Sequence, residues 1–109
     1  MLTMSKSRIT INPGDPIPLE TPGDILRQDF LEPAGISAYR LAKAIGVPPM
    51  YISKILHGGG ISAEMGILLD IAFGMSPGFW SRLQAEYATR IARRKLGDKV
   101  DNVTRLFAA

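Results

Sequence analysis

Four side chains in the middle of the sequence have the chemistry needed to contact the edges of DNA bases. Lys54 could donate to the O6 or N7 atom of guanine, and the Ser53 hydroxyl suits several bases. Met50 could meet the methyl group of thymine, and Pro49 lies beside it. The alternative is that all four are ordinary exposed helix residues. Contact with bases requires that they lie on the outward face of a helix, near its N-terminus.

A second set of side chains could contact phosphate groups rather than bases. Arg40 and Lys43 supply positive charge, and Ser37 supplies a hydroxyl that could instead serve only as a helix cap. Tyr39 and Tyr51 could each reach a phosphate through the phenol oxygen, or could pack between helices. Together the two sets predict an interface with double-stranded DNA.

The sequence does not favour catalysis or the binding of a metal or cofactor. His57 is the only histidine and there is no cysteine, so neither a zinc site nor a thiolate nucleophile can be assembled. The run Gly58-Gly59-Gly60 lacks the lysine of a phosphate-binding loop and follows a predicted helix. We therefore expect no enzyme activity, no metal and no cofactor.

The residues between the candidate side chains predict a helix-turn-helix, at about residues 37–57, that would position them. Ser37 would cap the first helix, Gly46 would end it, and Pro48-Pro49 would begin the second. Two short helices packed as a simple hairpin are the alternative. Counted from Ala38, the motif needs buried aliphatic side chains, a small residue and a turn glycine at fixed positions. These positions are filled by Leu41, Ala42, Ile45, Gly46, Val47, Ile52 and Ile55.

Two further helices are predicted on either side of this motif. The first would begin at Thr21-Pro22-Gly23-Asp24 and end near Leu31, because Pro33 and Gly35 follow. Ser62 would cap the other, which runs through Ala72. Their inward residues are expected to be Ile25, Leu26, Phe30 and Leu31 in the first, and Met65, Leu68, Leu69 and Ala72 in the second.

A fifth helix is predicted to begin at Ser76-Pro77, which makes the fold an all-α, five-helix domain of the phage-repressor-like (lambda repressor-like) type. Its apolar stripe is expected to form part of the core or a dimer interface, with a surface for another protein as the alternative. The stripe residues are Phe79, Trp80, Leu83 and Tyr87. Four basic residues follow, and they could form a solvated helix end or contact DNA or an acidic partner: Arg90, Arg93, Arg94 and Lys95.

Three regions are expected along the chain. Prolines and glycines predict an extended N-terminal arm over residues 1–20, followed by the helix-turn-helix domain over 21–96 and a C-terminal extension over 97–109. The extension could form one short amphipathic turn, expected to involve Val100, Val103, Leu106 and Phe107.

Composition and charge narrow the class of protein further. The chain has 109 residues, of which 46% are apolar, and this length fits one domain. No run of about 18 apolar residues and no signal peptide is present, so we expect a cytoplasmic protein without membrane contact. The net charge of +3 arises largely from residues 74–97. Residues 21–73, which contain the candidate interface, are close to neutral, so charge adds little to the case for DNA.

Several blocks of this sequence resemble the HigA-type antitoxins of bacterial toxin–antitoxin operons. The resemblance covers roughly residues 21–90, and it pairs the helix-turn-helix blocks with the later block Ser76-Pro77-Gly78-Phe79-Trp80. It rests on Pro22-Gly23-Asp24-Ile25-Leu26, Phe30-Leu31-Glu32-Pro33, Gly35-Ile36-Ser37, Leu41 to Pro49, Ile52-Ser53-Lys54-Ile55-Leu56 and Ile61-Ser62-Ala63, with Leu83-Gln84 and Tyr87.

This resemblance implies a cytoplasmic homodimer that represses its own operon by sequence-specific DNA binding and neutralises a RelE-like ribonuclease toxin. The sequence departs from the family at positions that are usually basic, namely Tyr51, Gly59, Gly60 and the segment Gly66 to Asp70. Each lost phosphate contact lowers affinity and its salt dependence. Two alternatives therefore stay open: a stand-alone phage-like repressor, and a protein-interaction antitoxin with weakened DNA binding.

Overall fold

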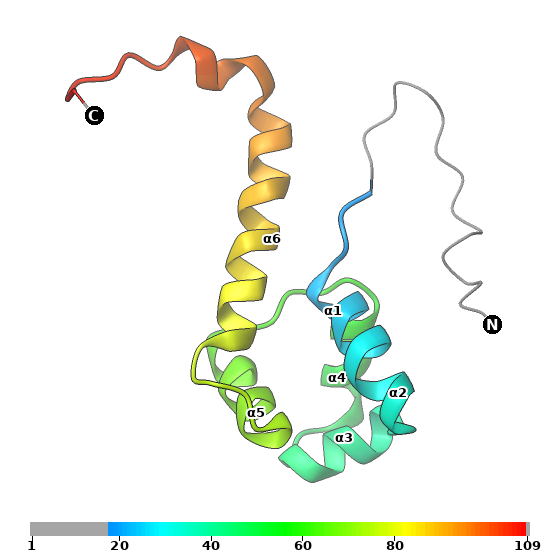
Figure 1. Ribbon diagram of the computed structural model, residues 1–109. Helices are drawn as coiled ribbons and strands as arrows, with labels where there is room; N and C mark the ends of the chain where they lie inside the picture. The colour runs from blue at the N-terminus through cyan, green and yellow to red at the C-terminus, as the bar shows by residue number, and fades with distance from the viewer. Residues whose placement is uncertain (1–17, 109) are drawn as a thin grey trace.

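The computed structural model describes residues 18–108. All regular secondary structure in that range is helical, and it contains no strand. An N-terminal helical rod is followed by α3 (Ala38–Ile45), α4 (Pro49–Leu56), α5 (Ala63–Phe73) and α6 (Phe79–Leu96), which matches the predicted five-helix architecture. Figure 1 shows the rod, α3, α4 and α5 grouped into one body from which the long α6 rises. Most of the predicted N-terminal arm, residues 1–17, lies outside the described residues.

The first rod begins where the sequence predicts, because Thr21 and Asp24 cap it reciprocally. The Asp24 amide donates to Thr21 Oγ1 over 3.0 Å, and the Thr21 amide donates to Asp24 Oδ2 over 3.0 Å. Pro22 occupies the first turn, where a missing N–H costs little. This cap fixes the start of α1 (Pro22–Ile25).

The predicted end of this first helix, near Leu31, is wrong by three residues. The rod continues through a π-helical segment (Leu26–Leu31) into α2 (Glu32–Ala34) and ends at Gly35, which has a φ of 66°. Pro33 cannot donate to the preceding turn, and its ring would press on the carbonyl four residues before it. The wider π turn accommodates the proline, as the bond from the Glu32 amide to the Arg27 carbonyl shows.

The core lies where the rod, α3, α4, α5 and the first turn of α6 meet. Its largest fully buried side chains are Trp80, Leu26, Ile52 and Leu69. The Phe30 ring packs on Phe73 and Trp80, with centroid distances of 4.9 Å and 5.0 Å. A small number of aromatic side chains therefore joins the N-terminal rod to the C-terminal helices.

The buried face of α5 differs from the predicted one. Met65 and Leu69 are buried as expected, but Leu68 is only partly buried and Ala72 is exposed. Gly66 is buried instead, and a Cβ there would lie 3.0 Å from Ser81 Oγ on α6. The helix α6 approaches α5 closely at this glycine. The buried face of α5 is therefore the side that carries Gly66, and not the side that hydrophobicity alone predicts.

The helix α6 begins later than predicted, at Phe79 rather than at Ser76-Pro77. The buried Asp70 carboxylate accepts hydrogen bonds from the amides of Gly78, at 2.9 Å, and Trp80, at 3.2 Å. A carboxylate from α5 thus satisfies the first N–H groups of α6, a role that a local cap usually fills.

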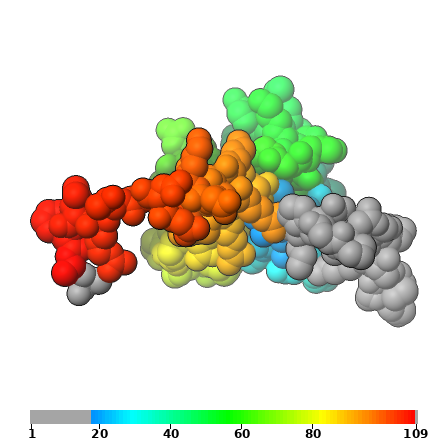
Figure 2. Space-filling model, turned by 90° about the horizontal axis from the view of Figure 1, so that it is seen from above, coloured from blue at the N-terminus to red at the C-terminus, as the bar shows by residue number. Residues whose placement is uncertain are grey.

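The C-terminal extension is a 3-10 turn (Gly97–Asn102) followed by a chain that leaves the body of the molecule (Figure 2). Val100 lies in that turn, but Val103, Leu106 and Phe107 follow it and are 75–85% exposed. The predicted amphipathic turn through all four residues is therefore wrong, because the described chain offers no surface against which they pack.

Candidate nucleic-acid interface

The pair α3 and α4 forms the predicted helix-turn-helix. Ser37 Oγ accepts from the Arg40 amide over 3.0 Å and so caps α3. Gly46, with a φ of 75°, ends α3 in the left-handed conformation that suits glycine. Pro48 is extended and Pro49 opens α4, as the sequence indicates. Behind the turn the motif buries Leu41, Ala42, Ile52 and Ile55 almost completely.

All the side chains predicted to contact DNA are exposed. The exposed fractions of Tyr39, Met50 and Tyr51 are 63%, 60% and 49%, so neither tyrosine is enclosed between helices. Tyr51 nevertheless lines a pocket together with Met65 and Leu68 of α5. The structure thus leaves every member of both predicted sets accessible on α3, on α4 or at the cap of α3. Lys54, however, lies in the last turn of α4 and not near its N-terminus as predicted. The full set is Ser37, Tyr39, Arg40, Lys43, Pro49, Met50, Tyr51, Ser53 and Lys54.

The charge of this region is more favourable to nucleic acid than the balance over residues 21–73 indicates. Residues 37–57 contain Arg40, Lys43 and Lys54 and no acidic residue. The acidic residues that offset these charges in the balance over residues 21–73 lie outside the motif, on the rod or on α5. One of them, Asp70, is buried against α6. The motif itself is therefore cationic, with hydroxyl, phenol and thioether groups between the charges.

Three positions in the segment Gly66 to Asp70, where related proteins are expected to carry basic residues, are buried and cannot face DNA. Gly66 and Asp70 are buried where α5 meets α6, and Leu69 between them belongs to the core. Within the segment Gly66 to Asp70, Ile67 is exposed, so a basic side chain at that position would reach solvent. At Gly59, a Cβ would lie 2.8 Å from the Lys54 carbonyl oxygen, so the backbone there favours glycine.

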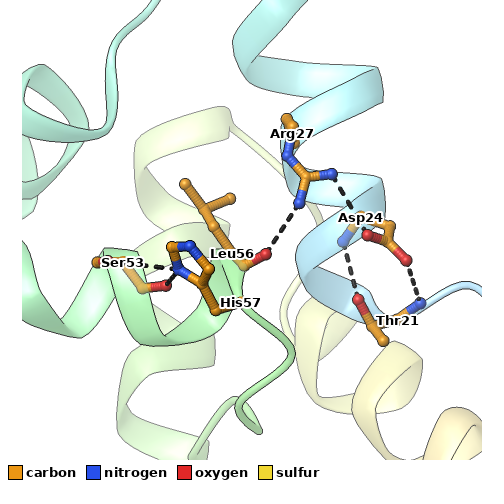
Figure 3. A network of polar contacts seen from close by, with 6 residues as sticks. All are labelled: Thr21, Asp24, Arg27, Ser53, Leu56 and His57. Atoms are coloured by element: carbon orange, nitrogen blue, oxygen red, sulfur yellow. Dashed lines mark hydrogen bonds and ion pairs between the residues drawn. The ribbon is translucent and has the colours of Figure 1, made fainter. Parts of the chain in front are cut away.

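The C-terminal end of α4 carries a group of polar contacts shown in Figure 3. His57 Nδ1 lies 2.7 Å from the Ser53 carbonyl oxygen and donates to it when that nitrogen carries a proton. His57 thus closes the last turn of α4. Across the described residues, no group of three or more histidine, cysteine or acidic side chains is arranged to hold a metal ion.

One contact in Figure 3, between Arg27 and Leu56, has no local signal in the sequence. Arg27 Nη2 donates to the Leu56 carbonyl oxygen over 2.8 Å, and Arg27 Nη1 donates to Asp24 Oδ1 over 3.3 Å. The first of these bonds joins residues 29 positions apart. Neither helical periodicity nor motif spacing relates such residues, so sequence reasoning missed Arg27.

The predicted apolar stripe of α6 contributes mainly to the core. Trp80 is fully buried, and Phe79 packs against it edge-on with a centroid distance of 5.4 Å. Leu83 also packs against the core. Tyr87 is half-buried and, together with Leu83, lines a small pocket beside the start of α1.

The basic group Arg90, Arg93, Arg94 and Lys95 is exposed on the distal half of α6. In Figure 1 this half stands away from α3 and α4, so within one protomer it does not extend the candidate interface. None of the helices among residues 18–108 is long and apolar enough to cross a membrane.

Comparisons with known proteins point to one family. A helix-turn-helix family profile matches residues 28–80, a range that includes the whole of the α3–α4 motif. The antitoxin HigA-1 of Vibrio cholerae is 33% identical over 87 residues, which is 80% of this chain and 83% of that protein.

Solved structures agree with this. The antitoxin HigA of Pseudomonas aeruginosa, solved with the higBA promoter, superposes with a TM-score of 0.73 at 35% identity and covers 81% of this chain and 97% of that one. The antitoxin GraA, solved in complex with its operator, superposes with a TM-score of 0.74 at 38% identity. That alignment covers 92% of this chain and 100% of GraA.

Proposed function

Since this chain belongs to the HigA family of helix-turn-helix antitoxins, we propose that it binds the operator of its own operon as a homodimer and neutralises a RelE-like ribonuclease toxin. The observation that carries the DNA-binding part is the cationic, accessible surface of α3 and α4. The proposal is supported by the superposition of the chain as a whole on relatives that were solved with promoter or operator DNA.

In this proposal α4, which we call the reading helix, enters the major groove. Lys54 donates to a guanine edge, and Met50 packs against a thymine methyl group. Ser37, Arg40 and Lys43 hold the phosphates of one strand, because they lie on the preceding helix or at its cap. Tyr39 and Tyr51 reach the backbone through their hydroxyl groups.

The homodimer follows from the size of the reading helix. Its eight residues are about 12 Å long and reach only a few base pairs. Two copies about 34 Å apart, one DNA turn, would read two half-sites. The side chains of Ile67 and Ile71 on α5 are 56% and 73% exposed, and they supply apolar surface for contact with a second copy. Sedimentation equilibrium tests this: a monomer at micromolar concentration would contradict it.

Operator binding is tested by titrating salt in a mobility-shift assay with the region upstream of the gene. With two cations per protomer on the phosphates, Arg40 and Lys43, the log–log salt slope for the dimer is expected to be about −4. Upstream DNA should bind far more tightly than a scrambled duplex of the same length. Equal affinity for both duplexes would contradict the proposed repressor role.

Toxin neutralisation is tested separately, starting from the reading frames beside the gene. A neighbouring frame for a small RelE-like protein should arrest growth when expressed alone, and this chain should restore growth and copurify with it. If no such neighbour exists, the stand-alone repressor becomes the better description. If rescue occurs without any operator preference, the chain acts as a protein-interaction antitoxin.

A further inference from the structure

We infer that Arg27 is a positioning residue for the reading helix: held by Asp24, its guanidinium fixes the C-terminal end of α4 and thereby the angle at which α4 meets DNA. This inference rests on the proposed function. It concerns a residue outside both sets of candidate contacts, on the N-terminal rod that packs behind the reading helix.

The guanidinium joins two fixed points. One is the Leu56 carbonyl oxygen, 2.8 Å from Nη2, at the end of α4 where helix carbonyls lack intrahelical partners. The other is Asp24 Oδ1, 3.3 Å from Nη1, and Asp24 is itself held by its reciprocal cap with Thr21. A planar group with several N–H donors can serve both acceptors at once. A positive charge also suits the negative end of a helix dipole.

Gly23 provides an independent observation that the rod and α4 must lie in close contact here. It is buried, and a Cβ at this position would overlap the Ile55 carbonyl group. The backbone of α1 therefore rests directly on the last turn of α4. The Arg27 bond lies one helical turn further along the same contact, so the two features fix the same end of the helix.

The position of this end matters because the reading helix is short. A tilt of about 10° at one end of a helix about 12 Å long moves the other end by about 2 Å. A hydrogen bond is lost over a smaller displacement than that. The candidate base contacts, Met50 and Lys54, lie on this helix, so their geometry depends on how its C-terminal end is held.

The test compares Arg27→Met, which keeps much of the aliphatic stem, with Arg27→Lys and with Arg93→Met on the distal half of α6 as the charge-matched control. Affinities for upstream and scrambled DNA are measured over a series of salt concentrations. For Arg27→Met we expect a loss of about fivefold or more in the ratio of the two affinities, comparable to one weakened base contact. The salt slope should stay unchanged. Arg27→Lys should recover part of the ratio, because its ammonium can reach one acceptor but not both at once.

Backbone amide exchange provides a readout that does not depend on DNA. Exchange at the end of α4, from Ser53 to Gly58, should accelerate in Arg27→Met and stay unchanged in Arg93→Met. If Arg27→Met does not fold, Arg27→Lys provides the test. A lower ratio of upstream to scrambled affinity, with an unchanged salt slope, supports the inference. A wild-type ratio in Arg27→Lys overturns it.

Three further results would overturn the inference or its premise. A wild-type affinity ratio in folded Arg27→Met would contradict a positioning role. Equal weakening on both duplexes, with a slope reduced by about one, would make Arg27 a phosphate ligand instead. If the unmodified protein itself shows no preference for upstream DNA, the proposed repressor function fails, and the inference fails with it.

Discussion

The α3–α4 pair and the α5–α6 pair are both two helices joined by a short turn, yet different forces define them. In the first pair a serine cap, a left-handed glycine and two prolines set the boundaries, and the helices pack through aliphatic residues at fixed spacing. In the second pair α5 also has a serine cap, Ser62, and a left-handed glycine, Gly74. Its buried glycine Gly66, however, sets the approach of the helices, and a buried carboxylate caps the later helix across eight to ten residues. The first pair is therefore specified by local signals, whereas the approach of the helices and the start of α6 in the second pair are specified by contact.

The two pairs also differ in their roles, because one contributes mainly to the stability of the fold and the other carries the candidate interface. The buried residues of α5 and α6 carry much of the core, including Leu69 and Trp80. The exposed residues of α3 and α4 carry the cations of the candidate interface, Arg40, Lys43 and Lys54. Substitutions of buried residues in α5 and α6 should therefore change stability, whereas substitutions of these exposed cations should change DNA affinity.

The largest effect is expected for Trp80→Ala. Trp80 is fully buried against Phe30, Phe73 and Phe79, so its removal should lower the free energy of unfolding by about 3–5 kcal/mol. Urea denaturation measures this. Trp80→Phe should cost clearly less, since it keeps a ring and removes an indole N–H that has no hydrogen-bond partner within the described structure. Equal losses in the free energy of unfolding for both variants would show that the packing of an aromatic ring is not the main contribution of Trp80 to stability.

The next effect is expected for Asp70→Ala, which removes the carboxylate that caps α6. Two amides, of Gly78 and Trp80, would lose their acceptor, and the buried one cannot readily bond to water instead. We expect a loss of about 2 kcal/mol or more in thermal or urea unfolding. Asp70→Asn keeps one acceptor oxygen and should lose less. A stable Asp70→Ala protein would mean that α6 starts without this cap.

In the α3–α4 pair, Lys54→Ala should act on binding and leave stability within about 0.5 kcal/mol of the wild type. Lys54 is exposed on the reading helix, so its loss should weaken operator binding by about 1 kcal/mol or more. The mobility-shift assay at fixed salt measures this, with Lys95→Ala on α6 as the control. Unchanged affinity in Lys54→Ala would remove this side chain from the interface.

The smallest effect is expected for Gly46→Ala. Gly46 has a φ of 75°, and no heavy atom lies within 4 Å of the place that a Cβ would occupy, so the cost comes from the backbone conformation alone. We expect about 1 kcal/mol in the free energy of unfolding. Gly60→Ala is the control, because Gly60 lacks a positive φ and its Cβ would meet only the Gln84 side chain at ordinary distances. Similar costs for both would contradict a special role for the left-handed turn.

The helix-turn-helix is predictable from the sequence because its signals are local. A hydroxyl before a helix, a glycine after it and a proline in a first turn each act within four residues. The exposure of the candidate side chains follows from that local geometry, since the buried face of each helix is occupied by Leu41, Ala42, Ile52 and Ile55.

Elsewhere the sequence-based prediction is wrong for two different reasons. Helical spacing places Ala72 inside, yet it is exposed, because α5 is apolar on more than one side and Gly66 decides which side meets α6. The first helix continues past Pro33 because a π turn, a local irregularity, accommodates the proline. Regular helical periodicity includes neither the neighbouring helix that selects a buried face nor the wider turn that accommodates a proline.

By itself, then, the sequence determined the presence of the five helices, the caps of α1, α3 and α5, the helix-turn-helix and the residues that could contact DNA. Only the tertiary structure decided that Asp70 caps α6, which face of α5 is buried, and that Arg27 binds the end of the reading helix. The physical reason is range: local caps and periodicity act between neighbours along the chain, whereas the Asp70 cap, close packing and the Arg27 bond depend on residues that folding brings together.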